Sequence, residues 1–392
     1  PEVPPSRFSP VSLSPLRPSR TGLCPETWRI LVPARARFLH LAPFILIAVV
    51  AFSLFGPRVP TTVPGAAIAA SPHGRTTVST TTITIPTYVV AWLLLSALAP
   101  VWVPGALIVG VIRRRSMIVL RLLLVVWAYL TIELIGLLRA ASIYAFTPRA
   151  QRQERFFRLT RWWGTSLFRS IRRVFALEVV VEGDDQILPG PLLVLERHAS
   201  IIDTILPVVL ISEAKGLPLR YVFKRELLVD PCIDVAGHVW PNYFINRGGE
   251  SEREIAGVRA LAENLGDEGV LIYPEGTRFT TQKHARALRR LAERHPELVS
   301  AACTMQHVLP PKPGGVLALL DAAPNADCLI VAHRGLEGFA EVNDLLDGSI
   351  VGRKLLVKMW RIPSQDIPAE SERAQWLFDV WKEVDRFAGE DD

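Results

Sequence analysis

The order of apolar and polar positions divides the 392-residue chain into a proline-rich start, a long apolar region and an alternating region. Residues 1–37 show no apolar periodicity and contain eight prolines and six arginines, so we expect a disordered basic tail. Apolar stretches follow at 38–56, 88–112 and 117–138, each close to the ~20 residues that a helix needs to cross a bilayer. The pattern predicts membrane segments over residues 38–138.

The next segment, residues 139–176, is basic and amphipathic. Along 155–175, apolar side chains recur every three or four residues and arginines occupy the opposite side of a helical wheel. This pattern and the paired tryptophans are typical of a helix that lies on an anionic membrane surface. The alternative is a helix that packs onto a domain core with a solvated arginine face. The apolar positions are Phe156, Leu159, Trp163, Leu167, Ile171 and Val174.

Residues 177–392 read as one α/β domain, because short apolar runs alternate with amphipathic stretches. We expect a mostly buried sheet flanked by helices, with helices after residues 251, 281 and 370. The predicted strands are 177–183, 191–196, 220–224, 242–246, 269–274, 327–333 and 354–360.

Charge is distributed unevenly and suggests an orientation in the membrane. Residues 1–150 carry 14 basic and 3 acidic groups, whereas residues 151–392 carry 30 basic and 35 acidic groups. The positive-inside rule then places the tail and the arginines at 113–115 in the cytoplasm, with the threonine-rich loop 57–87 outside. A cleaved signal peptide is disfavoured because the first apolar stretch starts late, although the small residues at 64–70 leave that alternative open.

The third apolar stretch carries Arg121 and Glu133, each costing about 2.5–3.5 kcal/mol at the centre of a bilayer. Residues 149–173 contain eight arginines and one glutamate and should also stay inside. We therefore expect the third stretch to be re-entrant or interfacial, and the domain that follows to be cytoplasmic. In the alternative, all three stretches cross and the tail is outside.

The first candidate chemistry is "LERHASIIDTILP" at residues 195–207. A histidine follows a predicted buried strand, and an aspartate lies five residues further on. Ser200 and Asp203 fit a capping box that starts a helix. Alternatively, Asp203 reaches back to His198, fixes its tautomer and stabilises the imidazolium when the other ring nitrogen takes a proton.

Three more stretches present charged groups, two of them where a predicted strand ends. "YFINRGGESE" presents Arg247, whose guanidinium suits a bidentate grip on phosphate. "LIYPEGTRFT" presents Glu275, Thr277 and Arg278, and "HVLPPKPGG" presents Lys312 in a proline-rich turn. Taken singly, a surface salt bridge for Arg247 and a local ion pair in the Glu275–Arg278 turn remain alternatives.

Together, "HASIID", "FINR", "PEGTR" and "VLPPK" resemble the glycerophospholipid acyltransferase family in order and spacing, over about residues 190–315. "EGTRFT" followed by "LPP" looks similar to the branch that contains lysocardiolipin acyltransferases and eukaryotic-type 1-acylglycerol-3-phosphate acyltransferases. "FKRELLVDPCIDVAGH" departs from the simpler family pattern by an acidic insert, which leaves the identity of the acceptor open.

The resemblance implies transfer of a fatty acyl group from acyl-CoA or acyl carrier protein to a lysophospholipid, with 1-acylglycerol 3-phosphate giving phosphatidic acid. It implies His198 as the base and Asp203 as the residue that orients it. Other acceptors within this expectation are lysocardiolipin, another lysophospholipid or glycerol 3-phosphate. The substrate-binding set that it implies is Lys224, Arg247, Glu275, Gly276, Thr277, Arg278, Pro310 and Lys312.

Two functions of other classes are weighed against this one. A lipid-ester hydrolase would need a nucleophile elbow such as G-x-S-x-G, and the sequence has none. A non-catalytic lipid-binding or scaffold protein is disfavoured by the intact His198, Asp203, Arg247 and Glu275. We expect no metal and no cofactor beyond the acyl donor, because the cysteines and histidines show no ligand spacing. The expected partners are membrane lipids, and no nucleic acid.

Overall fold

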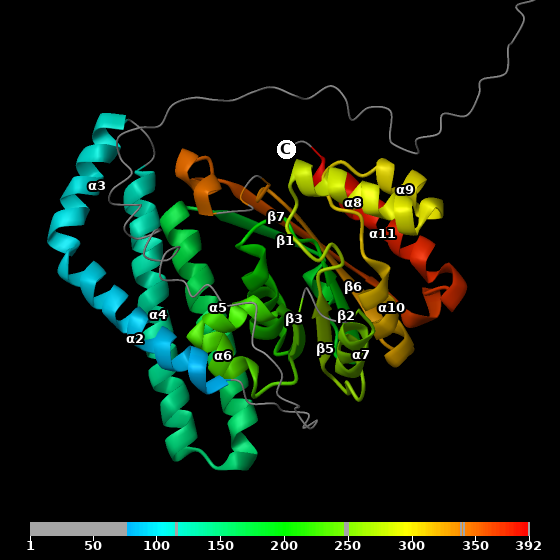
Figure 1. Cartoon of the computed structure of the whole chain (residues 1–392), viewed down its shortest axis with the longest axis horizontal. Coiled ribbons are helices and arrows are strands. Elements are labelled where there is room, and N and C mark those ends of the chain that lie inside the picture. Colours follow the sequence, from blue (N-terminus) through cyan, green and yellow to red (C-terminus); the bar gives the residue numbers. More distant parts are fainter. Residues whose placement is uncertain (1–76, 114–116, 247–250, 338, 340–341, 391–392) are drawn as a thin grey trace, which may run out of the picture. The chain divides into compact units, whose positions relative to one another are not determined.

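A seven-stranded sheet organises the chain after residue 177 in the computed structural model (Figure 1). The structure describes residues 77–113, 117–246, 251–337, 339 and 342–390, so the predicted tail and the first apolar stretch lie outside the described residues. All seven predicted strands are confirmed. They are β1 (Glu178–Glu182), β2 (Leu192–Glu196), β3 (Leu219–Lys224), β4 (Tyr243–Ile245), β5 (Gly269–Ile272), β6 (Asp327–Arg334) and β7 (Lys354–Ile362).

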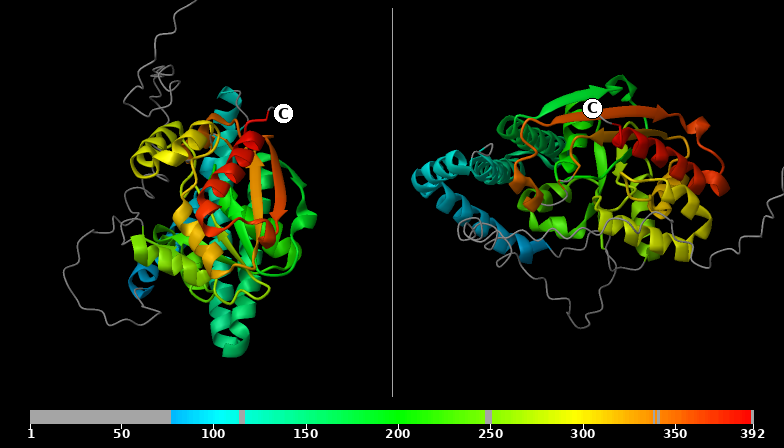
Figure 2. Two further views of the ribbon diagram at one scale, coloured as in Figure 1. Left: turned by 90° about the vertical axis from the view of Figure 1, so that its right-hand side faces the viewer. Right: turned by 90° about the horizontal axis from the view of Figure 1, so that it is seen from above.

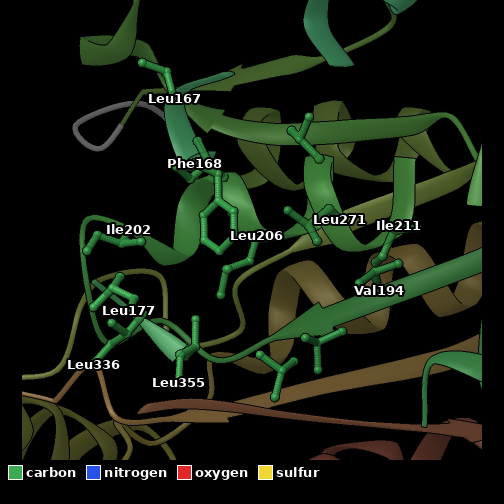
Figure 3. Close-up of a cluster of buried hydrophobic side chains, with 14 of the residues drawn as sticks. Leu167, Phe168, Leu177, Val194, Ile202, Leu206, Ile211, Leu271, Leu336 and Leu355 are labelled. Carbon is green, nitrogen blue, oxygen red and sulfur yellow. The ribbon is translucent and has the colours of Figure 1, made fainter. Parts of the chain in front are cut away.

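The strands run in the order β1-β7-β6-β2-β5-β3-β4. Only β6 and β7 pair antiparallel, and every other neighbouring pair is parallel. The central strands β2 and β5 are buried at every position, as expected of continuous apolar runs in a parallel sheet covered on both faces. Figure 3 shows side chains of the resulting core, including Val194 of β2 and Leu271 of β5.

Helices cover both faces of the sheet. In Figure 1, α5 (Arg149–Phe175) lies on one side and α10 (Pro313–Ala322) and α11 (Arg373–Ala388) lie on the other. The predicted helices after 251, 281 and 370 are α7 (Ser251–Leu261), α8 (Thr281–Arg294) and α11. Shorter elements are α6 (Pro231–Gly237), α9 (Val299–Cys303), a π-helical segment (Val208–Glu213) and 3₁₀ turns at Asp184–Gln186, Asp203–Ile205, Arg225–Val229, Pro296–Leu298, Val342–Asp347, Ser364–Asp366 and Glu370–Glu372.

The bend in the membrane region lies in the second apolar stretch and not, as expected, in the third. The third apolar stretch forms one helix, α4 (Ile118–Phe146), which is long and apolar enough to cross a membrane. The second stretch, together with residues 77–87 of the expected loop, forms α2 (Thr77–Ala97) and α3 (Ala99–Arg113), so the helix begins earlier than expected. The apolar parts of α2 and α3 meet at an angle of 66°. The bend coincides with Pro100, which has no N–H to continue the helical hydrogen bonds. A re-entrant turn within the third stretch was therefore wrong, because the bend lies in the second.

Arg121 and Glu133 of α4 both have partners inside the protein. The Arg121 guanidinium donates to the carbonyl of Val174 at the end of α5. Glu133 is fully buried and accepts hydrogen bonds from the Trp163 indole and from the Cys232 backbone amide. The insertion cost assigned to these side chains does not apply to groups that face protein partners.

The apolar face of α5 packs within the protein. Phe156, Leu159 and Leu167 are buried, and Ile171 packs against the main core. The apolar stripe expected to enter the membrane is therefore covered, and the alternative of core packing is correct. The tryptophan pair had favoured membrane contact, but the Trp163 indole donates a hydrogen bond to Glu133 inside the protein. Membrane contact through the arginine face stays a prediction.

Figures 1 and 2 show α2 and α3 beside α4, with α5 between α4 and the sheet. These outer helices expose many large apolar side chains, which for a folded protein indicates a surface that meets lipid or protein. The exposed residues are Val89, Val90, Leu93, Leu94, Leu98, Val101, Leu107, Ile108, Val111, Ile112, Val126, Trp127, Ile135, Leu138, Tyr144 and Phe146.

Candidate active site

The motif residues gather where parallel strands end. His198 comes two residues after β2, Lys224 is the last residue of β3, and Glu275 follows β5. These strands are parallel neighbours, so their carboxyl ends lie along one edge of the sheet, where open α/β folds bind ligands.

His198 and Asp203 are in direct contact. The Nδ1 atom of His198 lies 3.0 Å from Oδ1 of Asp203, and both side chains are buried. The other oxygen, Oδ2, accepts the backbone N–H groups of Ala199 and Ser200, each at 2.7 Å. Asp203 thus both caps the turn and holds the imidazole. The helix expected to start here is a 3₁₀ turn that leads into the π-helical segment.

Burial and charge set the protonation states of this pair. Burial lowers the pKa of His198 below its ordinary value, Asp203 acts in the opposite direction, and the cations of Lys224 and Arg278 lower it further. Burial by itself would raise the pKa of Asp203, but the two neighbouring imidazoles, His198 first and then His333, outweigh it and hold that pKa below its usual range. His198 is therefore neutral at neutral pH, hydrogen-bonded to a carboxylate, and able to accept a proton. Among the described residues, no protein group is hydrogen-bonded to its Nε2 atom.

Glu275 joins two loops rather than facing a ligand. Its side chain is almost fully buried, Oε1 accepts the His198 backbone N–H at 2.9 Å, and Oε2 accepts the Leu309 backbone N–H at 3.0 Å. Burial raises the pKa of Glu275 to about 8, and the two N–H donors oppose that rise. Both oxygens are hydrogen-bonded to backbone N–H groups, so the geometry of Glu275 favours a structural role over the expected contact with substrate. Its side chain links the catalytic turn to the proline-rich loop.

The same loops interlock through backbone groups. The Phe279 N–H donates to the carbonyl of His198 at 3.1 Å, and the Lys312 N–H donates to the carbonyl of Pro274 at 2.9 Å. Gly276 has a φ of +67°, and a Cβ there would lie 2.8 Å from Nζ of Lys312. The positive φ is what favours glycine at this turn, because the end of the flexible Lys312 side chain could move away from a Cβ.

The remaining expected site residues are distributed around this centre. Lys224 and Arg278 are close enough to His198 to influence its pKa. Thr277 is half-buried in the same turn, Pro310 is buried, and Lys312 is exposed. Arg247, the expected phosphate ligand, lies outside the described residues. Within the described part of the chain, no group of three or more His, Cys, Asp or Glu side chains is arranged to hold a metal ion.

Sequence patterns missed several residues that support the site. Arg197 is buried beside His198, where it pairs with Glu337 and donates to the carbonyls of His307 and His333. Arg197 directly precedes the motif histidine, and this position could have indicated its role, but the motif patterns do not include it.

Two aromatic or imidazole rings were also missed. The ring of Tyr273 lies 4.5 Å from that of His198, centroid to centroid. The His333 imidazole lies 3.5 Å from Asp203. Neither belongs to a motif of charged residues, since Tyr273 and His333 each sit inside or beside an apolar strand.

Comparison with known proteins agrees with this geometry. Residues 178–332 match the family model described as Acyltransferase. The mouse 1-acyl-sn-glycerol-3-phosphate acyltransferase gamma is 32% identical over 172 residues, which are 42% of this chain and 44% of that protein. The human protein of the same name is 29% identical over 171 residues, with the same coverage. The matched region thus spans less than half of the length of these curated relatives.

A solved structure is also similar. It is the crystal structure of the 1-acyl-sn-glycerophosphate (LPA) acyltransferase PlsC from Thermotoga maritima, with a TM-score of 0.42 and 14% identity, covering 67% of this chain and 98% of that one. Residues 178–332 therefore form a domain of the acyltransferase family, and in the described part of the chain its histidine, E-G-T-R and proline-rich motifs meet at one edge of the sheet.

Proposed function

We propose that this protein is a membrane-bound O-acyltransferase that transfers a fatty acyl group from acyl-CoA or acyl carrier protein to the free hydroxyl of a lysophospholipid. The proposed acceptor is 1-acylglycerol 3-phosphate and the proposed product is phosphatidic acid. The observation that carries the proposal is the buried His198–Asp203 pair at 3.0 Å, with the imidazole neutral and its Nε2 unbonded among the described residues.

The chemistry follows from that pair. Nε2 of His198 takes the proton of the acceptor hydroxyl while its oxygen attacks the thioester carbonyl carbon, and Asp203 stabilises the imidazolium. The tetrahedral oxyanion then collapses, the carbon–sulfur bond breaks, and the imidazolium returns its proton to the leaving thiolate. The donor is already an activated ester, so no acyl-enzyme is needed.

Cations around the histidine suit an acceptor that carries phosphate. Lys224 and Arg278 contribute positive potential at His198, and Lys312 extends over the Gly276 turn. Charge-assisted contacts from such side chains are the usual means of holding a phosphate monoester. The sequence adds Arg247 to this set, as the resemblance implies.

An apolar cavity supports a lipid substrate. It has a volume of about 160 Å³ and lies between α5, the π-helical segment, β3 and α6. Thr204 and Ile205, which directly follow Asp203, belong to its wall, so the cavity begins next to the catalytic turn. Other lining residues are Phe156, Leu159, Val208, Tyr221, Phe223 and Ala236. A cavity with such apolar walls suits the acyl chain of a lipid substrate.

The acceptor panel is the decisive assay. Detergent-purified protein is incubated with labelled oleoyl-CoA, or with oleoyl acyl carrier protein, and with 1-acylglycerol 3-phosphate, lysocardiolipin, lysophosphatidylcholine or glycerol 3-phosphate. We expect labelled phosphatidic acid from the first acceptor at the highest kcat/KM. Absence of transfer to every acceptor from both donors would contradict the proposal, and preference for another lysophospholipid would correct the acceptor only.

A further inference from the structure

His333 lies in the catalytic centre although it belongs to none of the four motifs. It is on β6, one residue beyond the region that matches the family model, and its side chain is fully buried. Its Nε2 atom lies 3.1 Å from the carbonyl oxygen of Arg197 and 3.5 Å from Oδ2 of Asp203. Asp203 therefore sits between two imidazoles, His198 against Oδ1 and His333 near Oδ2.

The partners of His333 determine its tautomer. Both groups near Nε2 are oxygens that can only accept, so Nε2 must carry a proton. The other nitrogen, Nδ1, is buried and has no hydrogen-bond partner among the described residues. A proton there would leave a buried N–H unsatisfied, which is costly. The arrangement therefore favours a neutral ring that donates from Nε2.

We propose that His333 is a positioning residue that holds Asp203 and the backbone of Arg197 through its Nε2–H, and so fixes the carboxylate that orients His198. The inference rests on the proposed acyl transfer. Asp203 is a fully buried carboxylate, and its two backbone donors, Ala199 and Ser200, belong to its own turn. His333 is the contact that ties it to a different strand of the sheet.

This contact also explains how the turn is fixed to the sheet. Arg197 donates its backbone N–H to the carbonyl of Val331 on β6 and accepts at its own carbonyl from His333 two residues further along. The residue directly before His198 is therefore hydrogen-bonded to β6 on both sides. Loss of the imidazole donor would remove the contact to the carbonyl of Arg197 and the contact to Oδ2 of Asp203 together.

Three variants test the proposal in purified protein. His333→Leu removes the donor, His333→Gln keeps an N–H close to the position of Nε2, and Leu329→Ala is a matched control on the same buried face of β6. We expect His333→Leu to lower kcat by roughly 10- to 100-fold, the range found when the hydrogen-bond partner that orients a metal-binding histidine is lost. The KM values of acceptor and donor should change less than about twofold, because His333 reaches Asp203 and not the substrate.

The Gln and control variants distinguish positioning from general packing. His333→Gln should recover most of kcat, whereas Leu329→Ala should lower the melting temperature without changing kcat per folded molecule. Equal losses of kcat in His333→Leu and His333→Gln, or a loss of kcat in Leu329→Ala that scales with its melting temperature, would overturn the inference.

A double variant tests whether His333 acts through Asp203. If it does, adding His333→Leu to Asp203→Asn should cost less than about threefold more in kcat, because the group it positions has already lost its charge. A full multiplicative loss contradicts the proposal. Wild-type turnover in the same assay separates the two levels: no wild-type transfer refutes the proposed function, whereas normal transfer by His333→Leu refutes only this inference.

Discussion

At the residue scale, the buried imidazole of His198 determines how activity should depend on pH. Burial lowers the pKa of His198, and the neighbouring cations lower it further, against the opposing influence of Asp203. The neutral form is the base, so activity is present above that pKa and is lost as pH falls through it. We predict that the acid limb of kcat/KM lies below the ~6.5 of an unperturbed imidazole. A limb above pH 7 in a pH–rate profile would contradict this protonation assignment.

Asp203→Asn should shift that limb in a defined direction. The carboxylate raises the pKa of His198, so its removal should lower that pKa and move the acid limb to lower pH. We expect kcat to fall by about 10-fold or more, since Asp203 also fixes the tautomer, but by less than in His198→Ala. An asparagine retains one oxygen for the cap. If the variant instead melts at much lower temperature with normal turnover per folded molecule, Asp203 is only a cap.

Glu275→Gln tests the clasp between the two loops. The amide group of glutamine cannot accept both the His198 and the Leu309 N–H, so one buried donor loses its partner. We predict a loss of about 1–3 kcal/mol in unfolding free energy together with a lower kcat, measured by thermal melting and initial rates. A rise in acceptor KM alone, with unchanged melting, would return Glu275 to the substrate-contact role that its motif implies.

Sequence patterns located the reactive pair but not its supports. His198 and Asp203 were found because their spacing around a turn is short and repeated in a family. His333 and Arg197 were not, since a buried residue in an apolar strand carries no periodic signal and its partners come from distant parts of the chain. Arg247 remains a sequence prediction.

At the element scale, the C-terminal helix is part of the site although its residues are far from the motifs. Oδ1 of Asp385 on α11 accepts three successive backbone N–H groups, from Gln306 at 2.9 Å, His307 at 2.6 Å and Val308 at 3.0 Å. This carboxylate fixes the start of the loop that carries Leu309 and Lys312.

Asp385→Ala should therefore disturb that loop. Three backbone donors, of which Val308 is buried, lose a shared acceptor. We expect this to cost about 2 kcal/mol of stability and to raise the acceptor KM, because Lys312 is no longer held over Gly276. Asp379→Ala on the exposed side of the same helix is the control and should change neither quantity. If the two variants have equal melting temperatures and equal acceptor KM values, Asp385 of α11 does not hold this loop in place.

The strands and most helices of the domain followed from the sequence because strand-forming runs are apolar, short and separated by clear breaks. The α5 helix could not be assigned in that way. An apolar stripe has the same periodicity whether it meets lipid or protein, and only the positions of Glu133 and the domain core decide between them.

At the scale of the whole molecule, α4 and α5 decide the topology. They lie side by side, and α5 exposes Arg155, Arg158, Arg169, Arg172 and Arg173. A membrane-crossing α4 would carry these arginines into hydrocarbon at ~2.5–3.5 kcal/mol each. We therefore propose that α4 lies at the cytoplasmic surface, with the exposed faces of α2 and α3 in the lipid.

This topology predicts that positions 114 and 150, before α4 and after it, are on the same side. Single cysteines at positions 75, 114 and 150 in a cysteine-free background can be probed with an impermeant thiol reagent on intact cells. We expect labelling at 75 and protection at 114 and 150. Labelling of only one of 114 and 150 would show that α4 crosses the membrane.

The central claim is that His198 is the base of an acyl transfer. The most direct test is the turnover of His198→Ala with labelled acyl-CoA and 1-acylglycerol 3-phosphate, compared with the wild-type protein at equal folded concentration. We predict a loss of ~10²–10⁴ in kcat with little change in melting temperature, because the backbone of His198 keeps its bonds to Glu275 and Phe279. Turnover above one tenth of wild type in the alanine variant would contradict the claim.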